Sequence, residues 1–138
     1  MSLQDATVIA TLVVTDLAHA KAFYGETLGL EELGRLSEEE SGTAYQCGGG
    51  TYLYIYEREA PAGSTATACA FAVDDVAATV YALRERGVTF EEYDIPEMGL
   101  KTVDGIATQG PMQSAFFYDP FGNILAVDNS TRVLESLG

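Results

Sequence analysis

The sequence predicts an α+β fold built from two copies of one βαβββ pattern. In both halves of the chain, an apolar segment typical of a buried strand is followed by an amphipathic helix with an aspartate at its start. The aspartate and the glycine that ends the helix are equally spaced in the two halves, at Asp16 and Gly29 and again at Asp74 and Gly87. One copy alone does not easily cover both its helix face and the opposite sheet face, so we expect the copies to pair within one domain.

The first copy begins with a β-branched strand predicted at Thr7–Val14. Asp16 is expected to cap the helix, whose buried face recurs at helical spacing through Leu17, Ala20, Tyr24 and Leu28. Three further strands are predicted at residues 30–36, 43–47 and 51–56. An acidic turn at 37–42 and the triple glycine at 48–50 separate them.

The second copy repeats this order from a strand predicted at Ala66–Val73. Either Asp74 or Asp75 caps its helix, which ends at Gly87. The remaining strands are predicted at residues 88–93, near 102–107, at 114–118 and, after a turn at 119–123, at 124–127. We expect one domain over residues 1–138, with modules at about 6–58 and 65–128 and a tail at 129–138 that contains one short helix.

The chain is strongly acidic, with a formal net charge of −14 from 21 acidic and 7 basic residues. Such a surface repels phosphate backbones and anionic lipids, so we expect neither nucleic acid nor a membrane as a partner, whereas a cationic ligand is attracted. The same excess of acid also serves solubility. The first residues contain no basic segment followed by an apolar stretch, so a cytoplasmic protein is expected.

Short motifs occur in one register along the chain. They are Val14–Leu17 (V-T-D-L), Phe23–Tyr24, Leu28–Leu30 (L-G-L) and Tyr118–Asn123 (Y-D-P-F-G-N). In these motifs the chain resembles the vicinal oxygen chelate family, which includes glyoxalases, bleomycin-resistance proteins and extradiol dioxygenases. The resemblance covers residues 7–128. It implies that two βαβββ modules form a curved mixed sheet with a concave cavity, which holds the active or binding site, and that the protein is a homodimer.

Enzymes of this family bind a divalent metal through His and Glu side chains of the inner strands. The resemblance assigns these ligand places to Ile9 (or Ala10), Tyr54, Ala68 (or Thr67) and Ala126. None of these residues is His, Glu or Asp, although a divalent metal needs several such donors. We therefore expect no metal site and no other cofactor.

The register around Tyr54 favours a pocket for an aromatic ligand instead. Strand alternation places Tyr52 and Tyr56 on the same side as Tyr54, and small residues on the strand at 66–72 would leave room opposite them. The predicted ligand-binding residues are Tyr45, Tyr52, Tyr54, Tyr56, Ala68, Phe116 and Ala126. The alternative is that the tyrosines fill the cavity as core side chains.

The predicted function is metal-independent binding of a small aromatic or cationic molecule, similar to that of bleomycin-resistance proteins. The alternative is an enzyme of glyoxalase or dioxygenase type, with an unusual metal site or with metal-free acid–base chemistry. Asp104 and Tyr118 are the catalytic candidates for that alternative, and the loop at 101–110 would be a lid over the pocket. A third possibility is a filled cavity and a role in assembly.

Overall fold

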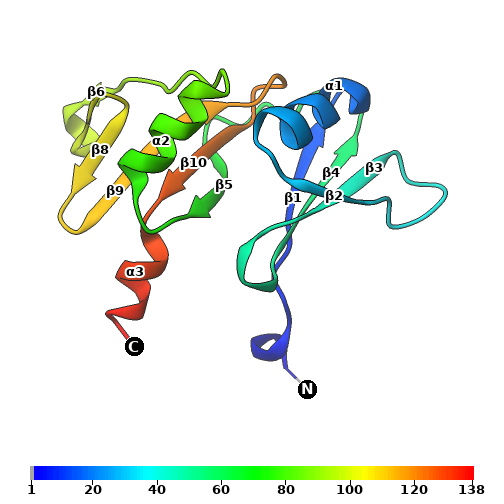
Figure 1. Cartoon of the computed structure of the whole chain (residues 1–138), viewed down its shortest axis with the longest axis horizontal. Helices are drawn as coiled ribbons and strands as arrows, with labels where there is room; N and C mark the ends of the chain where they lie inside the picture. Colours follow the sequence, from blue (N-terminus) through cyan, green and yellow to red (C-terminus); the bar gives the residue numbers. More distant parts are fainter. Residues whose placement is uncertain (1) are drawn as a thin grey trace. The chain divides into compact units, whose positions relative to one another are not determined.

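The computed structural model describes residues 2–138 and divides the chain into two compact units, with the boundary between Gly63 and Ser64 (Figure 1). We call residues 2–63 unit 1 and residues 64–138 unit 2. The architecture is mixed α+β, as the sequence predicts, and contains two curved sheets, one in each unit. The boundary lies between the two repeats of the sequence pattern.

Unit 1 contains a four-stranded sheet in the order β1-β4-β3-β2. Strands β1 and β4 are parallel, and the other neighbours are antiparallel. The strands are β1 (Ala10–Val14), β2 (Glu31–Gly34), β3 (Gly42–Gln46) and β4 (Tyr52–Glu57), with short 3-10 turns at η1 (Leu3–Asp5) and η3 (Gly48–Gly50). Each strand matches a predicted one, although β1 begins at Ala10 rather than at Thr7.

The helix of unit 1 combines an α-helical part, α1 (Leu17–Lys21), with one π-helical turn, η2 (Ala22–Thr27). Asp16 caps it as predicted, because its side chain accepts a hydrogen bond from the backbone N–H of His19 at 3.0 Å. The wider turn is marked by the N–H of Leu28, which donates to the carbonyl of Phe23 five residues earlier. The sequence predicts a single α-helix here, and the π turn has no evident signal in it.

One face of the unit 1 sheet is covered by α1 and η2. The side chains buried in this layer are Leu12, Val14, Ala20, Tyr24, Tyr45, Leu53 and Ile55. Tyr24 on η2 and Tyr45 on β3 place their ring centroids 6.2 Å apart, which shows that Tyr45 points toward the helix. Each large apolar side chain buried in this way contributes about 1.5–3 kcal/mol. We call the opposite face of this sheet the helix-free face of unit 1.

Unit 2 contains a six-stranded sheet in the order β5-β10-β9-β8-β7-β6, in which β5 and β10 are parallel and the other neighbours are antiparallel. The strands are β5 (Thr67–Ala72), β6 (Asp94–Ile95), β7 (Leu100–Val103), β8 (Ile106–Gln109), β9 (Met112–Tyr118) and β10 (Ile124–Asp128). The helices are α2 (Val76–Glu85), η4 (Pro96–Met98) and, in the tail, α3 (Ser130–Glu135). Of the two predicted caps, Asp75 caps α2 by accepting from the N–H of Ala78 at 3.0 Å. Among residues 2–138, no helix has the length and apolar character to cross a membrane.

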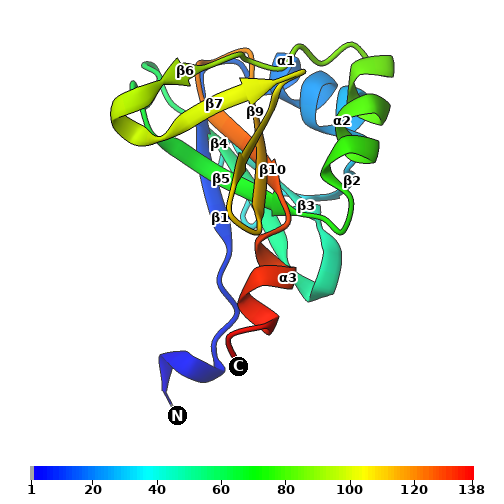
Figure 2. The ribbon, with the colours of Figure 1, turned by 90° about the vertical axis from the view of Figure 1, so that its left-hand side faces the viewer.

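Helix α2 lies along one face of the unit 2 sheet (Figures 1 and 2). Arg84 on α2 lies over the ring of Phe90, and Phe90 packs edge-on against Phe117 at 5.4 Å. Phe117 therefore points toward α2. Strand alternation places Phe116 on the other side of β9, which we call the helix-free face of unit 2.

Two strand predictions in unit 2 are wrong. Residues 88–93 form no strand, although the N–H of Glu91 donates to the carbonyl of Phe116 at 2.8 Å. The single strand predicted near 102–107 is instead a hairpin of β7 and β8, because Asp104 (φ 53°) and Gly105 (φ 80°) both adopt left-handed conformations. An Asp-Gly pair of this kind is the signal for a two-residue hairpin turn.

The hairpin turn is bonded to the rest of unit 2. The Glu92 carboxylate accepts from the Thr102 hydroxyl at 2.5 Å and from the N–H of Gly105 at 3.0 Å, and these bonds lower the pKa of Glu92. From the other side, Arg84 donates to the carbonyl of Asp104 at 3.0 Å. Most of residues 101–110 thus belongs to a hairpin held by hydrogen bonds rather than to the lid that the sequence suggested.

The turn between β9 and β10 is built on the buried carboxylate of Asp119. One oxygen accepts from the backbone N–H groups of Phe121 at 2.8 Å and Asn123 at 2.9 Å, and the other accepts from the Asn123 side-chain amide at 2.7 Å. The D-P-F-G-N motif therefore sets the pairing of the two central strands of unit 2.

Tyr45 provides a test of this core. Its side chain is fully buried, and its hydroxyl has no hydrogen-bond partner within residues 2–138. We expect Tyr45→Phe to leave the free energy of unfolding unchanged or to raise it by up to about 1–3 kcal/mol, because the variant buries no unpaired hydroxyl. Tyr54→Phe is the matched control: it removes a bonded hydroxyl and should cost about 1 kcal/mol. Urea denaturation at pH 7 measures both, and a destabilised Tyr45→Phe would contradict the expectation.

The same residue predicts a pH dependence. Burial, and then the negative charge of Glu32, raise the pKa of Tyr45 to about 12, whereas an unfolded tyrosine titrates near its ordinary value of about 10. The folded state therefore favours the neutral phenol. The contribution of this preference to the free energy of unfolding is complete below about pH 10 and is lost as the pH rises toward 12. Tyr45→Phe should accordingly lose less stability between pH 9 and 11.5 than the wild type. Equal losses would show that Tyr45 does not titrate with unfolding.

Candidate ligand-binding site

Alternate residues of β4 form an aromatic row on the helix-free face of unit 1. Leu53 and Ile55 point into the core beneath α1 and η2, so Tyr52, Tyr54 and Tyr56 share the opposite face. The rings of Tyr54 and Tyr56 stack at 6.2 Å with 15° between their planes. The shared face that the sequence predicts for these three tyrosines is present.

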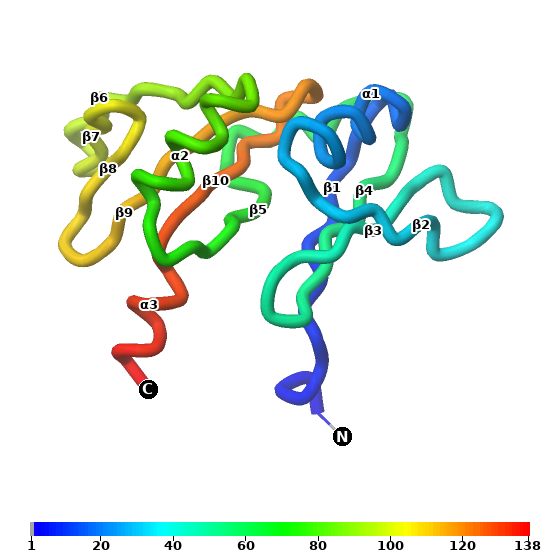
Figure 3. The backbone as a smooth tube through the Cα atoms, viewed as in Figure 1, coloured from blue at the N-terminus to red at the C-terminus, as the bar shows by residue number. Residues whose placement is uncertain are grey.

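The loop that joins β2 to β3 (Figure 3) contacts the middle of this row through Glu40. Its last part brings the Glu40 carboxylate to the Tyr54 hydroxyl, which donates to it at 3.2 Å. Tyr54 also lies directly over Gly42, where a Cβ atom would come within 2.5 Å of the hydroxyl oxygen. Only glycine leaves room for the ring at this point. Burial and the charge of Glu40 raise the pKa of Tyr54, so its hydroxyl stays protonated and remains a donor.

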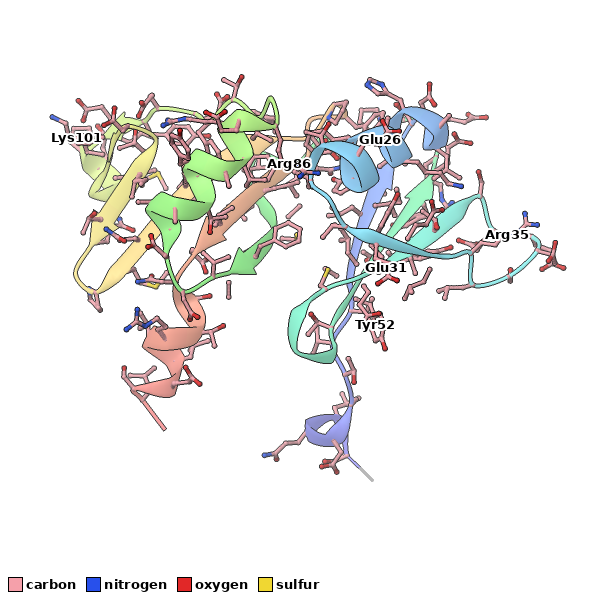
Figure 4. The ribbon with its side chains drawn as sticks, in the orientation of Figure 1. Glu26, Glu31, Arg35, Tyr52, Arg86 and Lys101 are labelled. Atoms are coloured by element: carbon pink, nitrogen blue, oxygen red, sulfur yellow. The ribbon has the colours of Figure 1, made fainter. Side chains whose placement is uncertain are left out.

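The three tyrosines differ in their access to solvent. Tyr54 is only 7% exposed and Tyr56 is half-buried, whereas Tyr52 is 38% exposed. Tyr52 lies in a row with Gln46 and Glu31 across three strands. Figure 4 shows the Tyr52 and Glu31 side chains near each other at the end of the unit 1 sheet away from α1. Tyr52 therefore offers the most accessible ring to a ligand, and Tyr54 supports the row from within.

Tyr45 does not belong to this row. In the β3–β4 register it pairs with Leu53, so it faces the helix, and its hydroxyl lies beside Gly25 of η2. The prediction that it shares a pocket with Tyr54 is wrong in this respect. The residue of β3 opposite Tyr54 is Ala44, because antiparallel pairing aligns those two positions.

The predicted residues of unit 2 lie on its helix-free face. Phe116 pairs with Ala126 across β9 and β10, and Ala126 pairs with Ala70 of β5. Alternation along β5 places Ala68 on the same side as Ala70. The ring of Phe116 is covered edge-on by Tyr93 at 5.7 Å, a residue that the sequence analysis did not select. Ala126 is almost fully buried, while Ala68 is exposed.

No hydrogen bond or ion pair joins the two catalytic candidates within residues 2–138. Asp104 lies in the β7–β8 turn, and its backbone carbonyl accepts a hydrogen bond from Arg84 of α2. Tyr118 lies at the end of β9 on the helix-free face, where it forms a hydrogen bond with Tyr93. Burial and this contact raise the pKa of Tyr93. Asp104 and Tyr118 thus have different bonding partners.

Two charged residues at the tyrosine row were missed by sequence reasoning. Glu40 belongs to an acidic run that we assigned to a solvated turn, and nothing in that run distinguishes it from its neighbours. Arg58 follows β4 by one residue, and its guanidinium lies 4.5 Å from the centre of the Tyr56 ring. The signal for Arg58 was available, because alternation from Tyr56 places residue 58 on the same face.

The four places for metal ligands show no set of donors. Ile9 precedes β1, Ala68 and Ala126 carry methyl groups, and the only oxygen belongs to Tyr54, whose hydroxyl is engaged by Glu40. Nor does any group of three or more His, Cys, Asp or Glu side chains within residues 2–138 have the spacing to hold a metal. The residues present do not fit a divalent metal of the His/Glu type.

A depression of about 420 Å³ lies elsewhere, on β7, β8 and β9 of unit 2. Its lining residues are Lys101, Val103, Ile106, Thr108 and Gln113. Gln113 and Phe116 fall on opposite faces of β9, so this depression is not part of the helix-free face. None of its residues was predicted as a site residue.

Comparison with known proteins identifies the family. The sequence profile of the Glyoxalase/Bleomycin resistance protein/Dioxygenase superfamily matches residues 6–127, which include most of both units and all of the tyrosine row. The chain belongs to this superfamily. Among curated proteins, none matches the chain significantly.

Solved structures of superfamily members share the fold. A glyoxalase/bleomycin resistance protein from Catenulispora acidiphila is 25% identical, with a TM-score of 0.60, over 88% of this chain and 96% of that one. One from Streptomyces sp. CB03234 is 24% identical, with a TM-score of 0.65, over 89% and 99%. A glyoxalase family protein from Enterococcus faecalis is 22% identical, with a TM-score of 0.63, over 92% and 99%. These likenesses support the fold and leave the ligand open.

The residues at the superfamily's ligand places lead to a prediction about metal content. Methyl groups and one engaged phenol provide too few donors for a transition metal. We expect purified protein to carry well under one equivalent of zinc, nickel, iron or manganese by elemental analysis. A stoichiometric metal that survives dialysis against a mild chelator would contradict this, and a superfamily member with the usual His and Glu ligands is the positive control.

Proposed function

We propose that this superfamily member binds a small planar molecule, aromatic or cationic, on the helix-free face of unit 1 without a metal. The observation that carries the proposal is the row of Tyr52, Tyr54 and Tyr56, which forms an aromatic surface around the one place, Tyr54, where the resemblance predicts a metal ligand. Aromatic rings stack on planar groups, and the phenols add a polar handle. On the helix-free face of unit 2, Phe116 and the exposed Ala68 would provide a separate apolar surface, with the buried Ala126 beneath them.

Charge supports a cationic partner. The net charge of −14 concentrates cations around the protein, and tyrosine faces attract a cation directly. At the tyrosine row itself, Glu40 is a half-buried carboxylate that forms no ion pair within 4 Å among the described residues. Bleomycin-type drugs combine flat groups with positive charge, so they fit this chemistry. A cytoplasmic location is part of the proposal, and it is compatible with Cys47 and Cys69, which form no disulfide within residues 2–138.

An enzyme of glyoxalase or dioxygenase type is the other function that superfamily membership suggests. No specific contact within residues 2–138 favours it, because the acid–base candidates Asp104 and Tyr118 bond to different partners and the ligand places lack donors. We therefore base the experiments on binding.

Tyr52→Leu tests the binding proposal. Loss of a stacking ring costs about 0.5–1.5 kcal/mol, so the Kd for ethidium, a planar aromatic cation, or for bleomycin should rise roughly 2- to 10-fold. Tyr81→Leu is the control, because Tyr81 is an equally large exposed tyrosine on α2. Fluorescence titration measures all three proteins. Equal dissociation constants for wild type and Tyr52→Leu, or no binding by the wild type, would reject the proposal.

We also propose that the protein is a homodimer. Within residues 2–138, β1 pairs with β4 alone and β5 with β10 alone, so each strand has one edge without a strand partner. Open edges of this kind are normally paired or covered, and closed two-fold dimers are the commonest assembly. Light scattering at micromolar concentration should give twice the monomer mass of 14.7 kDa. A monomer mass would contradict this proposal without affecting the binding proposal.

A further inference from the structure

We infer that the outer face of Tyr56 is a binding site for a guanidinium or amidinium group, and that Arg58 occupies this site in the free protein. This inference rests on the proposed function and narrows its ligand to planar cations of the amidine class. It assigns Arg58 the role of a residue that competes with the ligand.

The Tyr56 ring has two planar neighbours, and alternation along β4 puts Tyr54 before it and Arg58 after it on the same face of the sheet. Tyr54 stacks on the ring with 15° between the ring planes, and the Arg58 guanidinium lies over the ring at 4.5 Å from its centre. A guanidinium above a tyrosine face is held by the ring quadrupole and by planar stacking. The place that Arg58 fills therefore already has the shape and charge preference of an amidinium site.

Arg58 is held loosely at its side chain and firmly at its backbone. Its N–H donates to the carbonyl of Val14 at 2.9 Å, which extends the pairing of β4 with β1. Its side chain is exposed, and its one hydrogen bond goes to the carbonyl of the preceding residue, Glu57, at 2.8 Å. Arg58 forms no ion pair with a carboxylate within 4 Å among the described residues. The side chain can thus leave the ring without breaking a buried contact.

Glu40 gives the row its preference for positive charge. Its carboxylate accepts from the Tyr54 hydroxyl, so it lies beside the inner member of the stacked pair. The charges of Glu40 and Arg58 act on Tyr54 in opposite directions, Glu40 raising and Arg58 lowering the pKa of the phenol, which shows that both charges lie near this ring. A ligand that combines an amidinium with an aromatic ring would place the cation over Tyr56 and keep the charge balance that Arg58 now provides.

Arg58→Gln tests the inference with benzamidine as the probe and benzamide as its neutral analogue. Removal of the competing guanidinium should lower the Kd for benzamidine about 2- to 5-fold, the range expected for one exposed cation–π contact, and leave benzamide unchanged. Lys101→Gln is the charge control, because it removes the same charge from unit 2 and should have no such effect. The double variant Arg58→Gln/Tyr56→Leu should lose the gain. Thermal melts establish that each variant is folded.

The outcomes separate this inference from the proposed function. If Arg58→Gln leaves benzamidine binding unchanged while Tyr52→Leu weakens ethidium binding, the tyrosine row binds ligands but Arg58 does not compete for it. If benzamide gains as much as benzamidine, Arg58 acts as a steric cover and the amidine class is wrong. If neither Arg58→Gln nor Tyr52→Leu changes any affinity, both the inference and the proposed function fail.

Discussion

The arrangement of the candidate site depends on the strict alternation of β4. Leu53 and Ile55 must lie beneath α1 and η2, because their burial together with Tyr24 forms the core of unit 1. A strand has only two faces, so this requirement places every second residue on the opposite side. Three tyrosines and then Arg58 occupy those positions. The aromatic row is thus coupled to the core: a shift of register by one residue would expose the leucine and isoleucine and bury the tyrosines at once.

The row also needs a gap in the neighbouring strand. Tyr54 is nearly buried because Gly42 has no side chain and because the loop after β2 brings Glu40 to the phenol. A buried hydroxyl without a partner is costly, as the Tyr45 hydroxyl illustrates on the other face, whereas the Tyr54 hydroxyl is satisfied by a carboxylate. The stacked pair of Tyr54 and Tyr56 therefore starts from a fixed ring. A fixed ring loses little conformational entropy when a further planar group stacks beside it.

Three features could be predicted from the sequence: the strand–helix repeats, the Asp caps, and the shared face of Tyr52, Tyr54 and Tyr56. The repeats and the shared face follow from local periodicity, and the caps follow from side chains that bond to nearby backbone. The D-P-F-G-N turn belongs to the same class. Tyr45 was misassigned because its face depends on which residue of β4 it pairs with, and that register is not local. Glu40 was missed for the same reason, since its contact with Tyr54 joins a residue of the β2–β3 loop to a strand 14 residues later in the sequence. The hairpin at Asp104–Gly105 was a misread local signal: the Asp-Gly pair was visible and was taken as loop.

The superfamily fold constrains where a ligand meets the sheet more than it constrains the chemistry at that place. At a place where the resemblance to metal-binding enzymes predicts a donor, this chain carries Tyr54, and the phenol is already bonded to the carboxylate of Glu40. Exchange of a charged ligand for an aromatic ring removes the means of polarising a substrate and adds surface for stacking. The neighbouring residues also favour stacking. Tyr52 and Tyr56 extend the aromatic surface, and the Arg58 guanidinium lies on it as a planar cation would. The proposed site would discriminate between ligands by shape and charge, and its specificity would then depend on the residues that cover the rings and not on a coordinated ion.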